Sequence, residues 1–118
     1  MSGTRYVYAI QAGSRFKVGW SSDPERRRRD LQTGQPETLV IAAVWPDPDA
    51  TKIERLMHSI LDPYRVRGEW FECPIETVIA TWGRVQDARA TKRGWAAWQE
   101  RAVELGLAPI PAGDWRYP

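Results

Sequence analysis

Two side chains in the middle of the sequence could take part in metal and proton chemistry. Glu54 and His58 are four residues apart, and His58 is the single histidine of the sequence. Side chains at this spacing are neighbours on the surface of a helix. One carboxylate can hold Mg²⁺ together with waters, and an imidazole can carry a proton near neutral pH. The pair therefore indicates a candidate metal ligand beside a candidate proton carrier, with an ordinary polar pair as the alternative.

A run of four arginines at residues 26–29 could bind phosphate groups. Within residues 1–35, seven basic residues stand against three acidic ones, although the net charge of the whole chain is only +2. Arg27 precedes Leu31 by one helical turn, so we expect Arg27 to point toward the protein body and a site. A guanidinium binds two phosphate oxygens with its planar fork. The arginines expected to hold a phosphate backbone, with a solvated surface as the alternative, are Arg15, Arg26, Arg28 and Arg29.

The first elements that must position these side chains are predicted to be a β-hairpin and a short helix. Residues 5–11 and 15–20 are rich in β-prone side chains, and the small residues between them favour a tight turn. Ser22 and Glu25 have the spacing of a capping box, which predicts a helix over residues 22–33. A glycine directly after this segment is typical of a helix end.

The later elements alternate between strands and helices. Residues 38–45 are a continuous apolar run of strand length, which predicts a buried central strand. Apolar side chains at helical spacing predict a helix over residues 49–62. A short strand within residues 68–73 and helices over about 75–89 and 95–105 follow. This order predicts an α+β fold (β-β-α-β-α-β) with a small, mostly antiparallel sheet of three to four strands flanked by helices, plus two C-terminal helices.

Length and composition predict one globular unit without a membrane span. The chain has 118 residues, of which 42% are hydrophobic and 27% are charged. No apolar run approaches the roughly 18 residues of a membrane helix, and the N-terminus lacks a signal-peptide pattern. Cys73 is the single cysteine, so it forms no disulfide within the chain and builds no cysteine metal site. We therefore expect a cytoplasmic protein.

Several short motifs follow one another over the first 73 residues. They are Tyr6-Val7-Tyr8, Lys17-Val18-Gly19, Arg27 eight residues after that glycine, the Gln32–Pro36 turn, Glu54 with His58, and Gly68-Glu69-Trp70-Phe71. In this order and spacing they resemble the GIY-YIG nuclease superfamily, within it a branch of short phage and bacterial members. The resemblance implies a nuclease domain over residues 1–74, with residues 75–118 as a helical extension packed on it in one globular unit.

The resemblance implies a metal-dependent endonuclease that acts on nucleic acid, with DNA expected as the substrate in preference to RNA. Glu54 is implied to bind Mg²⁺ or Mn²⁺, and Arg27 to steady the phosphate. Tyr8 is implied to act as a base or to orient the attacking water, for which it needs a nearby cation. Lys17, on the partner strand, could be that cation. His58 is a candidate proton carrier or phosphate contact.

Two departures from the family's pattern keep other functions open. Lys17 replaces a tyrosine, and Leu31 stands where some members have a histidine. One alternative is therefore a domain that binds nucleic acid without cutting it. Another is a protein-interaction domain or homodimer that uses the tryptophan-rich C-terminal segment. The sequence assigns no role to Glu69. For Trp70 it favours a position in the core over a position on a surface that stacks bases.

Overall fold

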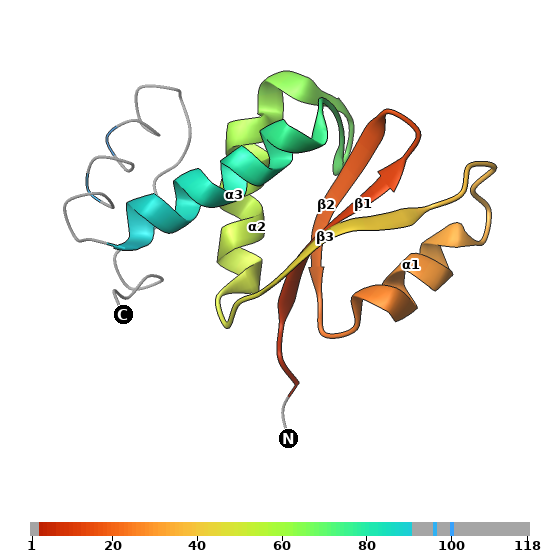
Figure 1. Cartoon of the computed structure of the whole chain (residues 1–118), viewed down its shortest axis with the longest axis horizontal. Helices are drawn as coiled ribbons and strands as arrows, with labels where there is room; N and C mark the ends of the chain where they lie inside the picture. Colours follow the sequence, from red (N-terminus) through yellow and green to blue (C-terminus); the bar gives the residue numbers. More distant parts are fainter. Residues whose placement is uncertain (1–2, 91–95, 97–99, 101–118) are drawn as a thin grey trace. The chain divides into compact units, whose positions relative to one another are not determined.

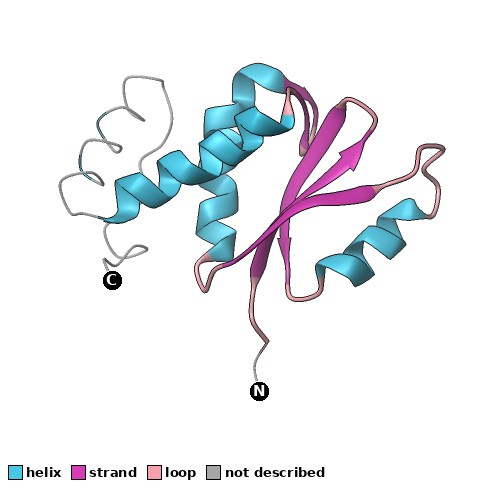
Figure 2. Cartoon of the chain, viewed as in Figure 1, coloured by secondary structure: helices cyan, strands magenta, loops and turns pink. Residues whose placement is uncertain are grey.

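The structure, a computed structural model, describes residues 3–90 together with Ala96 and Glu100. Figure 1 traces the chain and Figure 2 shows its helices and strands. The predicted α+β class, with a small antiparallel sheet flanked by helices, is confirmed. The elements are β1 (Tyr6–Ala12), β2 (Arg15–Ser21), α1 (Pro24–Gln32), β3 (Val40–Pro46), α2 (Ala50–Leu61), the 3-10 turn η1 (Asp62–Tyr64), β4 (Arg65–Arg67), β5 (Trp70–Glu72) and α3 (Ile75–Ala90).

The chain divides into two compact units, residues 1–81 and residues 82–118. The five strands and helices α1 and α2 belong to the first unit. The helix predicted over residues 95–105 lies almost entirely outside the described residues, and the packing of a C-terminal extension on the first unit stays a prediction. None of the described helices combines the length and the apolar character that a membrane span requires.

The strands of the first unit form one antiparallel sheet in the order β3-β1-β2-β5-β4. The predicted β1–β2 hairpin is confirmed, and its strands pair along their whole length, from Tyr6 opposite Ser21 to Ala12 opposite Arg15. Gly13 opens the turn with a φ of 59°, a conformation that glycine adopts without steric cost. The hairpin places β1 and β2 inside the sheet, with neighbours on both sides.

Strand β3 lies at an edge of the sheet, so the predicted central position of residues 38–45 was wrong. Among the described strands, β3 pairs with β1 alone, and a register shift between Ala9 and Ile10 interrupts the pairing. Val40 and Val44 are 53% and 38% exposed. An uninterrupted apolar run is ambiguous, because it does not alternate and therefore does not reveal that one side of the strand faces solvent.

A second hairpin, β4–β5, was predicted only in part. The sequence indicated one strand in residues 68–73, whereas β5 pairs with the additional strand β4. Gly68 turns the chain between them with a φ of 55°. All three residues of β4 are exposed and two are arginines, so no alternating apolar pattern marks the segment as a strand. The hairpin brings Glu69 next to β2, where the candidate site lies.

Helices α1 and α2 lie on opposite faces of the sheet (Figure 1). Helix α2 contacts β1 and β2, and its residues Ile53, Met57 and Leu61 are fully buried, as expected of an amphipathic helix. On the other face, Leu31 of α1 packs against a buried cluster formed by Tyr8, Ile10, Ala12 and Leu39. The sheet therefore separates the two helices that carry the candidate site residues.

Helix α1 begins one residue later than the capping-box spacing predicted. Asp23, rather than Ser22, caps it, because the Asp23 carboxylate accepts a hydrogen bond from the Arg26 N–H at 3.1 Å. No residue of α1 is fully buried. The helix is therefore held mainly through the partly buried Leu31, and its basic residues remain accessible to ligands.

Candidate active site

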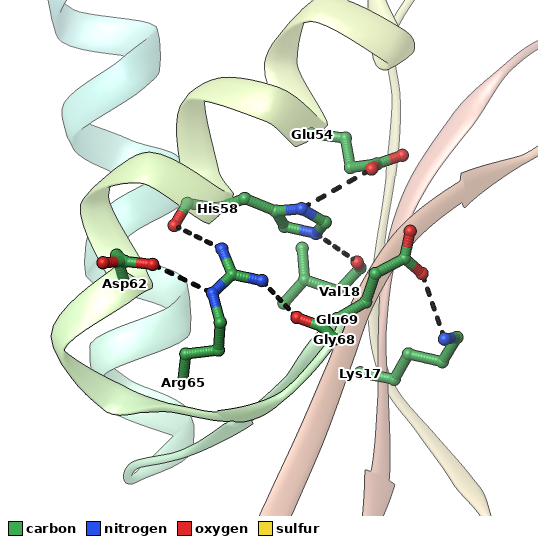
Figure 3. A network of polar contacts seen from close by, with 8 residues as sticks. All are labelled: Lys17, Val18, Glu54, His58, Asp62, Arg65, Gly68 and Glu69. Atoms are coloured by element: carbon green, nitrogen blue, oxygen red, sulfur yellow. Dashed lines mark hydrogen bonds and ion pairs between the residues drawn. The ribbon is translucent and has the colours of Figure 1, made fainter. Parts of the chain in front are cut away.

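The candidate residues meet at a stretch of the β2 edge that none of the described strands covers. Strand β5 pairs with β2 only from Arg15 to Lys17. Beyond this point the Val18 N–H donates to the Glu69 carbonyl at 3.3 Å, and the Val18 carbonyl accepts a hydrogen bond from His58 Nε2 at 2.6 Å (Figure 3). Side chains from the two faces of the sheet can therefore approach one another around this edge.

Tyr8 approaches the edge from the face that α1 covers. It pairs with Gly19 across the β1–β2 hairpin and is only 2% exposed. A Cβ atom at Gly19 would lie 2.5 Å from the Tyr8 hydroxyl oxygen, so the phenol ring lies across the glycine backbone. Burial raises the pKa of Tyr8 above its usual value of 10, while hydrogen bonding and charge from Arg27 act against this rise. Near neutral pH, Tyr8 is therefore a neutral phenol with a guanidinium at its hydroxyl group.

Glu54 approaches the edge from the opposite face, on helix α2. Its side chain is 14% exposed. The pKa of the Glu54 carboxyl is raised to about 7, first by burial and then by the charge of Glu69, while Lys17 and Arg55 act in the opposite direction. A desolvated carboxylate close to a second carboxylate carries negative charge that its surroundings do not balance. Glu54 is therefore suited to hold either a proton or a cation.

The contacts of His58 determine its neutral tautomer. A carbonyl oxygen can only accept, so the Nε2 atom beside Val18 carries a hydrogen. Burial lowers the pKa of His58, which favours the neutral ring. Its Nδ1 lone pair then faces Glu54 Oε1 at 3.7 Å (Figure 3). A protonated Glu54 carboxyl suits this lone pair better than a carboxylate does.

Lys17 and Glu69 form an ion pair beside these groups. Lys17 is only 9% exposed, and its Nζ lies 3.0 Å from Glu69 Oε2 (Figure 3). Glu69 raises the pKa values of both Tyr8 and Glu54, so its carboxylate belongs to the site. Sequence reasoning offered Lys17 as the cation beside Tyr8, but the cation that acts on the Tyr8 hydroxyl is Arg27. No role could be predicted for Glu69 from the sequence, although the Gly-Glu-Trp-Phe motif was a signal that could have led to it.

The residues expected to do chemistry come together, whereas the other arginines do not join them. The site contains Tyr8, Lys17, Arg27, Glu54 and His58. Arg15 instead faces Glu72, at 3.8 Å between Nε and Oε1. Arg28 is held by Glu25 within helix α1, at 2.6 Å between Nη2 and Oε1. Arg26 and Arg29 are exposed on the same helix, and the charge of Arg29 also acts on Glu25.

Arg65 connects helix α2 to the β4–β5 hairpin next to the site. Its guanidinium donates to the Asp62 carboxylate at 2.9 Å, to the His58 carbonyl at 3.4 Å, and to the Gly68 carbonyl (Figure 3). It also lies over the Phe71 ring, with its Cζ 4.8 Å from the ring centroid. Arg65 therefore fixes the end of α2 that carries His58 relative to the turn of the hairpin.

Replacing Arg65 by glutamine is expected to lower the free energy of unfolding by about 1–3 kcal/mol, because it removes the charged donor from several acceptors at once. Urea denaturation measures this change. Arg67→Gln is a matched control in the same strand. Because Arg67 is exposed, this substitution is expected to change the free energy of unfolding by less than about 0.5 kcal/mol. Equal losses in the two variants would show that the Arg65 contacts do not stabilise the fold.

Comparison with known proteins gives one family match. A family model described as the T5orf172 domain matches residues 5–86. No curated protein and no solved structure matches the chain.

The resemblance to the GIY-YIG nuclease superfamily was wrong, because the matching model describes a different family. The motifs behind that resemblance are at most five residues long, and such short patterns recur on hairpins and helices for packing reasons alone. T5orf172 domains form a nuclease-like, DNA-binding family, in agreement with a function that involves nucleic acid.

Proposed function

We propose, from the premise that the chain belongs to the T5orf172 domain family, that it is an endonuclease that hydrolyses phosphodiester bonds of DNA with a divalent metal ion. The observation that carries the proposal is the meeting of Glu54, Tyr8 and Arg27 at one uncovered strand edge. Phosphodiester hydrolysis needs positive charge near the phosphate and a group that orients the attacking water. A carboxylate for a cation, a guanidinium and a phenol meet these needs.

The donor set fits Mg²⁺ or Mn²⁺. The pKa of Glu54, raised to about 7, reflects a buried carboxylate close to Glu69 whose charge Lys17 and Arg55 compensate only in part. The described residues contain no group of three or more metal-ligating side chains. Mg²⁺ nevertheless commonly binds one or two carboxylates and completes its shell with waters and substrate oxygens. Bound there, the ion would stabilise negative charge on the phosphate and lower the pKa of a water.

The other side chains have roles that follow from their protonation states. Arg27 is always charged and binds the non-bridging oxygens of the phosphate. Tyr8 orients the attacking water by a hydrogen bond and does not act as the base, because its pKa is raised. Neutral His58 presents its Nδ1 lone pair to Glu54 and can accept the proton that Glu54 releases when it ionises. Lys17 holds the carboxylate of Glu69 in place.

Helix α1 offers a surface for the DNA backbone. Arg26 and Arg29 are exposed on the same helix from which Arg27 reaches the site. Backbone contacts of this kind release counterions, so the affinity for DNA should fall steeply as the salt concentration rises.

A module that binds DNA without cutting it is the second candidate. Two observations favour it. The charge of Lys17 is already neutralised by Glu69, and the raised pKa keeps Tyr8 protonated. This candidate predicts the same salt-dependent binding and no cleavage under any metal condition.

Cleavage assays separate the two candidates. We expect the purified chain to nick plasmid DNA or to cut single-stranded DNA with Mg²⁺ or Mn²⁺, and to lose this activity in EDTA. Glu54→Gln, purified in the same way, controls for contaminating nucleases and should be inactive. Intact DNA in every metal condition, or equal cutting by wild type and variant, would remove the endonuclease and leave the binding module.

A further inference from the structure

A cleft of about 540 Å³ opens directly beside the Lys17–Glu69 ion pair. Its volume lies within the range of about 300–1,000 Å³ that is common for ligand-binding clefts. Lys17 and Glu69 belong both to the cleft and to the candidate active site, so the two are continuous. The remaining lining residues are Ala12, Arg15, Gln35, Glu37, Arg67, Gly68 and Trp70.

The lining of the cleft combines one aromatic side chain with several polar and charged groups. Trp70 is half-buried, packs against the core cluster that contains Tyr8, and still lines the cleft. Lys17 Nζ lies 5.6 Å from the centroid of the Trp70 ring. Arg67 is exposed and has no side-chain partner among the described residues, so its guanidinium is available to a ligand. An indole next to cations is the combination that proteins use to hold single nucleotides of a strand.

We propose that this cleft binds one unpaired nucleotide of the DNA strand, and that this nucleotide lies next to the phosphate that is cut. The proposal rests on the proposed function. Its base stacks on Trp70, and its phosphate contacts Arg67 and also Arg15, which exchanges its Glu72 partner for the phosphate. Within a duplex each base is stacked on its neighbours and offers no free face, so the nucleotide must be single-stranded or turned out of the helix. The substrate is therefore DNA with an unpaired nucleotide next to the cut.

The first test measures binding without cleavage. Fluorescence anisotropy in EDTA compares a labelled single-stranded 12-mer and its blunt duplex on the full chain. Trp70→Leu should weaken binding of the single strand about tenfold or more, whereas Trp70→Phe, which keeps an aromatic face, should retain most of it. Trp20→Leu is the control, because Trp20 is a 39% exposed tryptophan that lies outside the cleft lining. Equal losses for Trp70→Leu and Trp70→Phe, or no loss for either, would overturn the proposal.

The second test changes the DNA rather than the protein, so it does not depend on whether a variant folds. Single abasic sites are placed at each position of the 12-mer and their affinities for the wild-type chain are measured. One position should weaken binding about tenfold, since it removes the stacking base. A flat profile would overturn the proposal. Effective competition by free deoxyadenosine monophosphate at micromolar concentration would also overturn it, because the cleft would then be a mononucleotide site.

The two proposals can fail separately. A position-dependent abasic profile without cleavage in any metal would remove the endonuclease and keep the nucleotide cleft. Metal-dependent cleavage with a flat abasic profile would keep the endonuclease and remove the cleft.

Discussion

Replacing Glu54 by glutamine is expected to raise the stability of the protein at pH 8 while abolishing cleavage. The Glu54 carboxyl has a pKa of about 7 in the folded chain, against 4.5 for an unperturbed glutamate. Since the folded-state value is raised, the wild type loses stability as the pH rises from about 4.5 through 7, where the unfolded chain ionises more readily. At about 1.4 kcal/mol for each pKa unit, the neutral amide should recover about 3 kcal/mol at pH 8. The glutamine N–H can also donate to the His58 Nδ1 lone pair.

Urea denaturation of wild type and Glu54→Gln at pH 5 and pH 8 measures this effect. The difference between the two proteins should be small at pH 5 and large at pH 8. Glu76→Gln is the control, because Glu76 is exposed in the first turn of α3. A variant that is less stable than wild type at both pH values would contradict the charge imbalance assigned to Glu54. A variant that is more stable but no longer cuts DNA would be typical of a functional side chain whose charge lowers the stability of the fold.

Replacing Gly19 by alanine is expected to reduce DNA cleavage at least about 100-fold, because displacing a reacting group by roughly 1 Å can have that effect. The added methyl group would lie 2.5 Å from the hydroxyl oxygen of Tyr8 and 2.7 Å from the ring atom that bears it. The ring is buried and must move, which should also lower the free energy of unfolding by about 1–3 kcal/mol. Cleavage is measured at a temperature at which circular dichroism finds the variant fully folded.

Two controls identify the cause of this loss. Gly83→Ala adds the same methyl group to helix α3 at a position with no heavy atom within 4 Å, so it should leave activity unchanged. If alanine at residue 19 acts by displacing Tyr8, then adding Gly19→Ala to Tyr8→Phe should lower cleavage no further than Tyr8→Phe does alone. Additive losses would show that Gly19 matters for another reason.

The sequence was most informative where one periodic pattern dominated. The apolar spacing in α2 predicted which side of the helix packs on the sheet, and it placed Glu54 and His58 at the margin of that side. Both side chains are 14–15% exposed, as such a position requires. The β1–β2 hairpin was predictable for a similar reason, since two β-prone runs flank a turn with glycine.

The sequence was least informative where long-range pairing decides the structure. Nothing local distinguishes the edge strand β3 from a central strand, because both can be continuous apolar runs. Strand β4 consists of exposed residues and forms because the turn at Gly68 returns the chain to β5. The contribution of Glu69 depends on this unpredicted hairpin, since it lies where β5 meets β2. Arg27 at the Tyr8 hydroxyl likewise depends on how α1 lies against the sheet.

Strand β5 pairs with β2 over only three residues, yet the turn before it supplies the Glu69 carboxylate. Short pairings at the periphery of a sheet open far more often than the sheet as a whole unfolds. Each such opening would release Glu69 and free the buried ammonium of Lys17, while the β1–β2 hairpin and α2 remain intact. We therefore expect the proposed cleavage activity to be lost, on heating, at a lower temperature than the one at which circular dichroism detects unfolding.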